Sequence, residues 1–133
     1  MPNTIINPDS LAKPIGFSHA VRADGGTTVY LAGQTAMDAD GNMVGAGDMA
    51  AQFRQVLANL RVAVEAAGGA LTDVVKLNIF VSDRDAYKRN TREIGAVYRE
   101  YFGKHYPAMT LVEIKSLWDD AALIEIEGVA VLS

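Results

Sequence analysis

The stretch from Tyr106 to Val131, YPAMTLVEIKSLWDDAALIEIEGVAV, decides the fold of this chain. It contains two runs in which apolar residues alternate, Ala108–Leu117 and Ala122–Leu132, joined by the acidic turn Trp118–Ala121. Alternation with a period of two is typical of β-strands, and a short polar turn between two such runs predicts a β-hairpin. We therefore expect the chain to end in two paired antiparallel strands.

In this pairing the two predicted strands present two different faces. One face is apolar enough for a core and carries Thr110, Val112, Ile114, Ala122, Ile124, Ile126 and Ala130. The other mixes large apolar groups with charges and carries Met109, Leu111, Glu113, Lys115, Glu125, Glu127, Val129 and Val131. A mixed face is typical of a cleft or a subunit interface, and the alternative is a half-exposed sheet face with scattered apolar residues.

The composition limits the class of protein. The chain has 133 residues, of which 50% are hydrophobic and 21% charged, and we expect one soluble domain over residues 1–133. Its net charge is -4 and its longest Lys/Arg run has two residues, so nucleic acid is not an expected partner. It has no cysteine, no signal-like N-terminus and no apolar run of membrane-spanning length. These features predict a cytoplasmic protein without a membrane partner.

Upstream of the opening stretch, three further strands and two helices are predicted. Phe17–Ala23 and Thr27–Thr35 flank an Asp-Gly-Gly turn and predict a second hairpin. Asp48 is a suitable N-cap for an amphipathic helix that ends at two consecutive glycines. Val74–Ser82 alternates and predicts a central strand, and the capping-box spacing at Asn90–Glu93 predicts the start of a second helix.

The predicted order of elements is typical of a two-layer α+β domain. Two long helices cover one face of a mixed sheet of about five or six strands, and the other face has no covering layer. Exposed apolar surface is unfavourable by roughly 25 cal/mol per Å², so we expect another copy of the chain to cover that face. The sequence therefore predicts a homo-oligomer, which a charge introduced at Leu111 would disrupt.

Several motifs resemble, in the same order, those of the RidA/YjgF family, also known as L-PSP endoribonucleases. They are Ala32–Gln34, Ala66–Gly69, Val74–Asp83, Tyr106–Ala108 and Ile124–Val131. The resemblance implies a chorismate-mutase-like α+β fold, assembled as a homotrimer around its sheet faces with three ligand clefts between subunits. It also implies hydrolysis of reactive enamine or imine intermediates of amino acids to a keto acid and ammonia.

The functional residues of the family carry over unevenly. The resemblance places the cleft glutamate, which orients water or relays a proton, at Glu125, and the backbone turn before the glutamine at Ala32 and Gly33. The arginine that grips the substrate carboxylate corresponds to Met109, which cannot make a charge-assisted bidentate contact. A family cysteine corresponds to Leu111. The chain thus retains the scaffold of the deaminases without their substrate grip.

Two further family positions are also altered. The cleft tyrosine of the N-terminal loop falls at Ser18. The asparagine of the second helix aligns with Gly95, or is displaced by an apparent insertion of about four residues around Lys88–Arg92. These departures indicate a cleft with a chemistry of its own.

Other polar and aromatic groups each have two interpretations. Glu125 is either a cleft acid/base or one of several acids in the last strand, and Phe80 either lines a pocket or packs. His19 and His105 are either structural or replace the lost polar grip. Arg89 and Arg92 are either solvated helix residues or substitutes for the missing arginine. With Glu125 as the candidate catalytic residue, the candidate substrate-binding residues are Ser18, His19, Ala32, Gly33, Phe80, Arg92, His105, Met109 and Leu111.

Two functions are consistent with these residues. The first is a hydrolase or deaminase that uses Glu125 and a water on a small imine-like, enamine-like or related substrate that need not carry a carboxylate. Met109 in place of the arginine disfavours classical 2-imino acid deamination. The second is a trimer that binds a small metabolite in the same cleft without turning it over. Ribonuclease activity is not supported, because the sequence predicts no basic surface for binding RNA. The two histidines and the scattered acids predict neither a metal site nor a cofactor.

Overall fold

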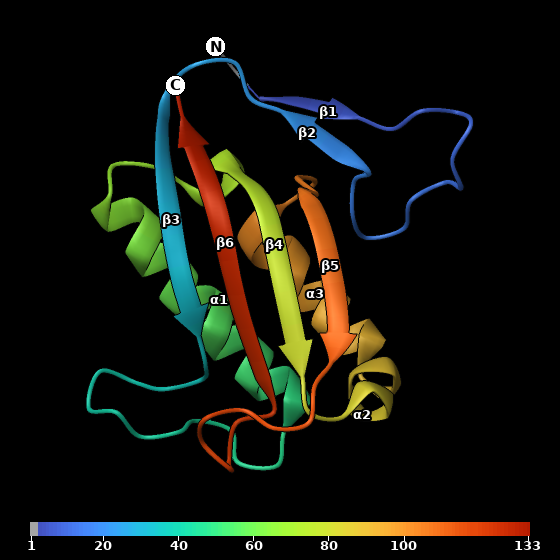
Figure 1. Ribbon diagram of the computed structural model, residues 1–133. Helices are drawn as coiled ribbons and strands as arrows, with labels where there is room; N and C mark the ends of the chain where they lie inside the picture. The colour runs from blue at the N-terminus through green and yellow to red at the C-terminus, as the bar shows by residue number, and fades with distance from the viewer. Residues whose placement is uncertain (1–2) are drawn as a thin grey trace.

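The computed structural model describes residues 3–133 and has a four-stranded sheet as its main layer (Figure 1). The strand order is β3-β6-β4-β5. These strands are β3 (Thr27–Gln34), β6 (Ile124–Leu132), β4 (Val74–Val81) and β5 (Ala108–Glu113). The pairs β3–β6 and β6–β4 are antiparallel, whereas β4–β5 is parallel, so the sheet is mixed.

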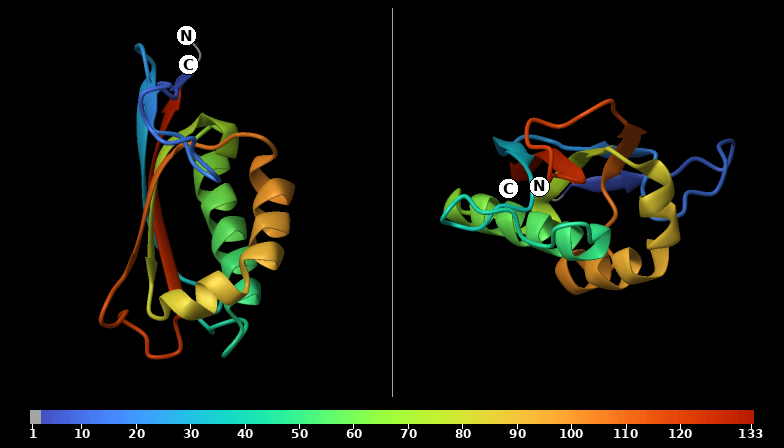
Figure 2. Two further views of the ribbon diagram at one scale, coloured as in Figure 1. Left: turned by 90° about the vertical axis from the view of Figure 1, so that its right-hand side faces the viewer. Right: turned by 90° about the horizontal axis from the view of Figure 1, so that it is seen from below.

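The helices form a second layer on one face of this sheet (Figure 2). They are α1 (Met49–Ala66), the short α2 (Arg84–Arg89) and α3 (Thr91–Phe102), and a turn of 3₁₀-helix, η1 (Leu71–Asp73), precedes β4. Within residues 3–133, no layer covers the opposite face of the sheet (Figure 2). The predicted two-layer α+β architecture with a mixed sheet is therefore confirmed.

Local sequence signals account for where the helices begin. The side chain of Asp48 accepts a hydrogen bond from the Ala51 amide at 3.1 Å, which caps α1 as predicted. The predicted stripe of α1 is buried and consists of Phe53, Val56, Leu57, Leu60 and Val64. The predicted capping box of α3 is not formed, because the Asn90 side chain instead donates to the Ala86 carbonyl of α2 at 2.7 Å.

Both predicted hairpins are wrong. β4 lies between β5 and β6 and pairs with each of them. β2 (Ala20–Arg22) pairs with β1 (Thr4–Ile6) in a separate two-stranded ribbon, and β3 pairs with β6 instead. The loop between β1 and β2 extends past the β5 edge of the main sheet (Figure 1). The predictions failed because they paired strands that are consecutive in the sequence, whereas α2 and α3 form a crossover that brings β5 parallel to β4.

The insertion of β4 also reverses the predicted face of β5. Ile79 pairs with Leu111 on one side and with Ile126 on the other, so these three residues share the helix-covered face. Met109 shares that face with Leu111, because residues two apart in a strand point the same way. Glu125 is adjacent to Ile126 and therefore lies on the opposite face from Met109, contrary to the prediction.

The uncovered face of the sheet, here called the open face, has a mixed composition. It carries Tyr30, Lys76, Asn78, Phe80, Thr110, Val112, Glu125, Glu127 and Val129. Asn78 donates to the Glu127 carboxylate at 3.1 Å, and Lys76 Nζ donates to Thr110 Oγ1 at 3.1 Å. Tyr30 is 81% exposed. Thr110 and Val112 were predicted on the core face and lie here instead, because β5 takes its orientation from β4.

Candidate functional site

A pocket of about 570 Å³ lies at the β5 edge of the sheet, beneath the helices. Its walls come from α2, α3, the end of the N-terminal loop and one residue of α1. Its lining is mainly apolar or aromatic and includes Ile15, Phe17, Phe53, Ile79, Tyr87, Ile94, Tyr98, Tyr106, Met109 and Leu111. A concave, largely apolar site with few polar groups is the usual form of a small-molecule pocket.

The floor of the pocket is formed by the helix-facing residues of β5. Met109 and Leu111 point into it because they alternate with the open-face residues of the same strand. The structure thus brings these two predicted site residues together. Both are apolar, so no cation or thiol lies on the floor at the two positions where the family resemblance led us to look for one.

The wall formed by α3 presents aromatic rings whose polar ends are already satisfied. Tyr98 stacks on Tyr106 with ring centroids 5.0 Å apart, and on Phe102 at 4.6 Å. Its hydroxyl donates to the His105 carbonyl at 2.8 Å. Burial and the neighbouring Tyr106 raise the pKa of Tyr98 well above the usual range. This residue therefore offers a ligand its ring and no free hydroxyl.

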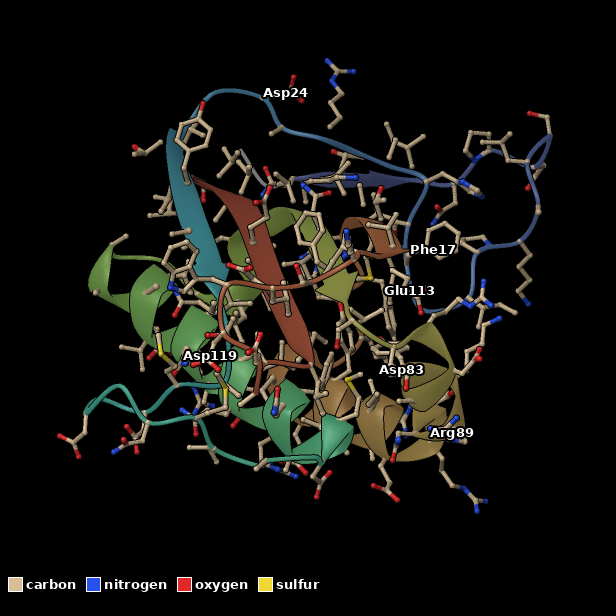
Figure 3. The ribbon with its side chains drawn as sticks, turned by 60° about the horizontal axis from the view of Figure 1, so that its bottom comes forward. Phe17, Asp24, Asp83, Arg89, Glu113 and Asp119 are labelled. Carbon is tan, nitrogen blue, oxygen red and sulfur yellow. The ribbon has the colours of Figure 1, made fainter. Side chains whose placement is uncertain are left out.

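The N-terminal loop is fastened to the start of β5 by Ser18. Its hydroxyl donates to the Tyr106 carbonyl and its amide donates to the Pro107 carbonyl at 3.0 Å. Ser18 is 4% exposed and does not line the pocket, so its placement is structural. The preceding residue, Phe17, lines the pocket instead, and Figure 3 shows it beside the β5 side of the sheet.

His19 belongs to the same loop and lies outside the pocket lining. Its ring stands edge-on to Phe17 with centroids 5.3 Å apart. Its Nε2 is 2.6 Å from the Ala12 carbonyl oxygen, and its amide donates to Asn7 Oδ1 at 2.7 Å. His19 therefore orders the loop that carries Phe17.

Glu125 lies on the open face together with three other predicted site residues, Ala32, Gly33 and Phe80. Its carboxylate packs directly against Gly33, where a Cβ atom would overlap it, so the two predicted positions are adjacent. Phe80 pairs with Glu125 in the register and is half-buried. Ala32 is exposed on β3. These four residues form a group on the face opposite to the pocket floor.

The remaining predicted residues lie away from the pocket. Arg92 is exposed and does not line it. Arg89 points outward from the end of α2 (Figure 3). His105 Nε2 is 2.7 Å from the Val74 carbonyl oxygen, and its side chain borders a second cavity of about 200 Å³ near Asn3. None of these three cationic or imidazole groups replaces the missing arginine in this pocket.

Most residues that line the pocket were missed by the sequence analysis, among them Phe17, Tyr87 and Arg99. Burial raises the pKa of the Tyr87 hydroxyl to about 12, so it is protonated at neutral pH. Within residues 3–133 this hydroxyl has no hydrogen-bond partner, whereas Thr91 on the same wall donates to the Lys88 carbonyl. A signal for Arg99 was present, because it follows Gly95 by one helical turn, and Gly95 had already been singled out.

The structure offers neither a metal cluster nor a membrane-spanning helix. No group of three or more metal-ligating side chains occurs among the described residues. Within the same part of the chain, every helix is too short or too polar to cross a bilayer.

Comparisons with known proteins agree with this fold. A family model described as Endoribonuclease L-PSP matches residues 8–132. A RutC family protein of Pyrococcus horikoshii is 38% identical over 127 residues, which cover 95% of either chain. A Rid family protein of unknown function from Yersinia pestis has a TM-score of 0.90 and 37% identity over 99% of this chain and 100% of its own. RidA from an Antarctic Psychrobacter has a TM-score of 0.70 and 29% identity, over 97% and 99% of the two chains. These matches confirm the resemblance, and the chain belongs to the RidA/YjgF (Rid) family of L-PSP endoribonuclease-like proteins.

Proposed function

We propose that this protein is a small-molecule hydrolase that acts on an imine-like or enamine-like substrate in a cleft shared by two subunits of a homotrimer. One observation carries the proposal. The apolar pocket opens at the β5 edge beneath the helices, whereas the candidate acid/base, Glu125, lies on the open face. In one copy, the binding pocket therefore lacks an acid/base, and the candidate acid/base, Glu125, lies away from that pocket.

A second copy would complete the site from its open face. That face carries aromatic and aliphatic groups that one chain leaves uncovered, including Tyr30, which is 81% exposed, and Val112, which is 41% exposed. It also carries Glu125. Packing this face near the β5 edge of a neighbour would bury the apolar groups and bring a carboxylate to the mouth of the pocket. Family membership supports such an assembly and a deaminase-like role.

The proposed reaction adds water across a C=N bond. The carboxylate of Glu125 orients a water and accepts one of its protons while the oxygen attacks the imine carbon. As the C–O bond forms, the nitrogen takes up one proton and a carbinolamine results. The proton that Glu125 accepted is then returned to the amine nitrogen, the hydroxyl loses its proton to the carboxylate as the C–N bond breaks, and a ketone and ammonia leave. An enamine enters the same sequence after tautomerising to the imine. Because Met109 and Leu111 form the floor, the substrate has an apolar body.

A second candidate function is a trimer that binds a small metabolite without turnover. A specific observation favours it: among residues 3–133, no carboxylate or imidazole lines the pocket of the single chain. Catalysis by acid and base thus depends wholly on a neighbour, whereas binding by the apolar lining does not. The experiments below separate the two functions.

The first experiment measures ammonia release. Imines are generated in situ by an amino acid oxidase from leucine and, as the less apolar comparison, from alanine, and 2-aminoacrylate serves as the enamine. A hydrolase should accelerate ammonia release over the buffer rate, most strongly for the leucine-derived imine, and Glu125→Gln should abolish the acceleration. Saturable ligand binding without any acceleration would instead establish the binding function.

The second experiment tests whether the site is shared. Glu125→Gln removes the acid/base, and Leu111→Trp fills the pocket, so either variant alone should be inactive. If one cleft uses Glu125 of one subunit and the pocket of another, co-expression of the two variants should restore about a quarter of wild-type activity in mixed trimers. No recovery in mixed trimers would contradict a shared cleft.

A further inference from the structure

Arg99 differs from every other side chain that lines the pocket, because it alone carries a charge among the lining residues of the described chain. It takes part in none of the ion pairs found within residues 3–133. The adjacent acid, Glu100, is engaged by Arg54, with Nη1 2.7 Å from Oε2. Arg99 is thus an exposed residue whose guanidinium has no anionic partner among residues 3–133 and lies at the edge of an apolar cavity.

Gly95 explains how this guanidinium reaches the pocket. In an α-helix a long side chain points toward the N-terminus and covers the turn before its own position, so Arg99 lies over Gly95. A Cβ atom at position 95 would be 3.3 Å from Arg99 Nη1, which is a tight contact. Glycine disfavours a helix interior, and here its small size makes room for the guanidinium against the helix.

A second unpaired polar group lies in the same pocket. The Tyr87 hydroxyl on α2 is a hydrogen-bond donor at neutral pH and has no partner within the described residues. Met109 and Leu111 contribute an apolar floor to the same cavity. The pocket thus combines one positive charge at its exposed edge, one neutral donor and an apolar surface.

We propose that Arg99, given access by Gly95, is the anion-binding group of this pocket, and that its ligands are small carboxylates with an apolar body and a hydrogen-bond acceptor that faces Tyr87. This inference rests on the proposed function and assigns to α3 the carboxylate contact that Met109 on β5 cannot make. A carboxylate is the anion that fits best, because one planar guanidinium matches it with two parallel hydrogen bonds. A phosphate dianion would remain undercompensated with a single cation.

The test uses two probes that differ only in the carboxylate. Phenylpyruvate has an apolar ring, a ketone and a carboxylate, and phenylacetone has the same ring and ketone without the charge. Binding is measured by titration calorimetry or by chemical-shift changes on the full-length protein. The wild-type protein should prefer phenylpyruvate, and Arg99→Gln should lower its affinity about tenfold or more while leaving phenylacetone binding unchanged. Lys104→Gln, which removes an exposed positive charge outside the pocket lining, is the matched control and should keep the preference.

Two further variants sharpen the assignment. Tyr87→Phe should weaken both probes to a similar extent, because both carry the ketone. The double variant Arg99→Gln, Met109→Arg moves the cation from α3 to the floor of the same pocket and should restore a preference for phenylpyruvate. Restoration would also show that Arg99→Gln loses this preference because the pocket lacks a positive charge, and not because the variant fails to fold.

The outcomes distinguish this inference from the proposed function. If the wild-type protein binds both probes equally, or if Arg99→Gln keeps the full preference for phenylpyruvate, the role of Arg99 is wrong while the pocket remains a small-molecule site. If neither probe binds at millimolar concentration, the pocket itself is not a small-molecule site, and the inference fails together with the proposed function.

Discussion

The two faces of the main sheet are formed by alternate residues of the same strands. They differ in burial, because the helices cover only one of them. On the helix-covered face, Leu77, Ile79 and Ile126 are at most 3% exposed, and the core continues into the pocket at the β5 edge. The open face carries Tyr30 and Glu125, and within residues 3–133 no second layer covers it. The first face is complete in one copy. The second face is the one that the proposed partner subunit would cover, and the proposed acid/base lies on it.

Because the two faces differ in this way, a mutation should have different effects on each of them. A change on the helix-covered face acts on folding or on the pocket of the same copy. In the proposed trimer, a change on the open face should act on association and on the pocket of a neighbour. Leu111 illustrates the point, because a charge there was predicted to break assembly and is now expected to disturb the pocket.

The largest expected effect comes from a charge on the covered face. Ile126→Asp places a carboxylate where the side chain is 1% exposed and apolar on all sides, which should cost several kcal/mol in the free energy of unfolding. Glu127→Val changes the next residue of β6, which is exposed on the open face, and should change the free energy of unfolding by less than about 1 kcal/mol. Urea denaturation measures both variants, and equal losses would contradict the assignment of the two faces.

The next largest effect should be on association. Tyr30→Glu puts a charge on the open face, where the proposed trimer would desolvate it, and should weaken assembly by roughly 2 kcal/mol or more per interface. Val62→Glu is the matched control, because Val62 is also an exposed apolar residue, at 67%, but lies on α1. Sedimentation velocity should show dissociation of the first variant only. Wild-type protein that sediments as a stable monomer at micromolar concentration would refute the trimer.

The smallest expected effect is an alkaline loss of stability from the pocket. The pKa of Tyr87 is raised by burial from 10.0 to about 12 in the folded protein. Below pH 10 the phenol is protonated in both the folded and unfolded states, whereas between pH 10 and 12 the unfolded state ionises first and is favoured. Stability should therefore fall by up to about 2 kcal/mol as the pH rises through this window. Tyr87→Phe should show a shallower decline in urea midpoint from pH 9 to 11, and an unchanged decline would exclude this residue as its cause.

The sequence by itself determined most of the secondary structure, since the responsible signals are local. The Asp48 cap, the stripe from Phe53 to Val64 and the alternation in β4 and β6 all follow from the geometry of a single helix or strand. The family motifs likewise pointed to Met109 and Leu111, which line the pocket, and to the adjacent pair Gly33 and Glu125.

Tertiary structure alone decided how these pieces combine. Alternation states which residues of a strand share a face, but not which face meets the helices, because that depends on the strand's neighbours. β5 takes its orientation from a parallel pairing with β4 across a helical crossover, and this separates Met109 from Glu125. The access of Arg99 and Tyr87 to the pocket also depends on packing between distant elements. Short-range periodicity carries no information about such contacts, and for that reason the site emerged only from the folded chain.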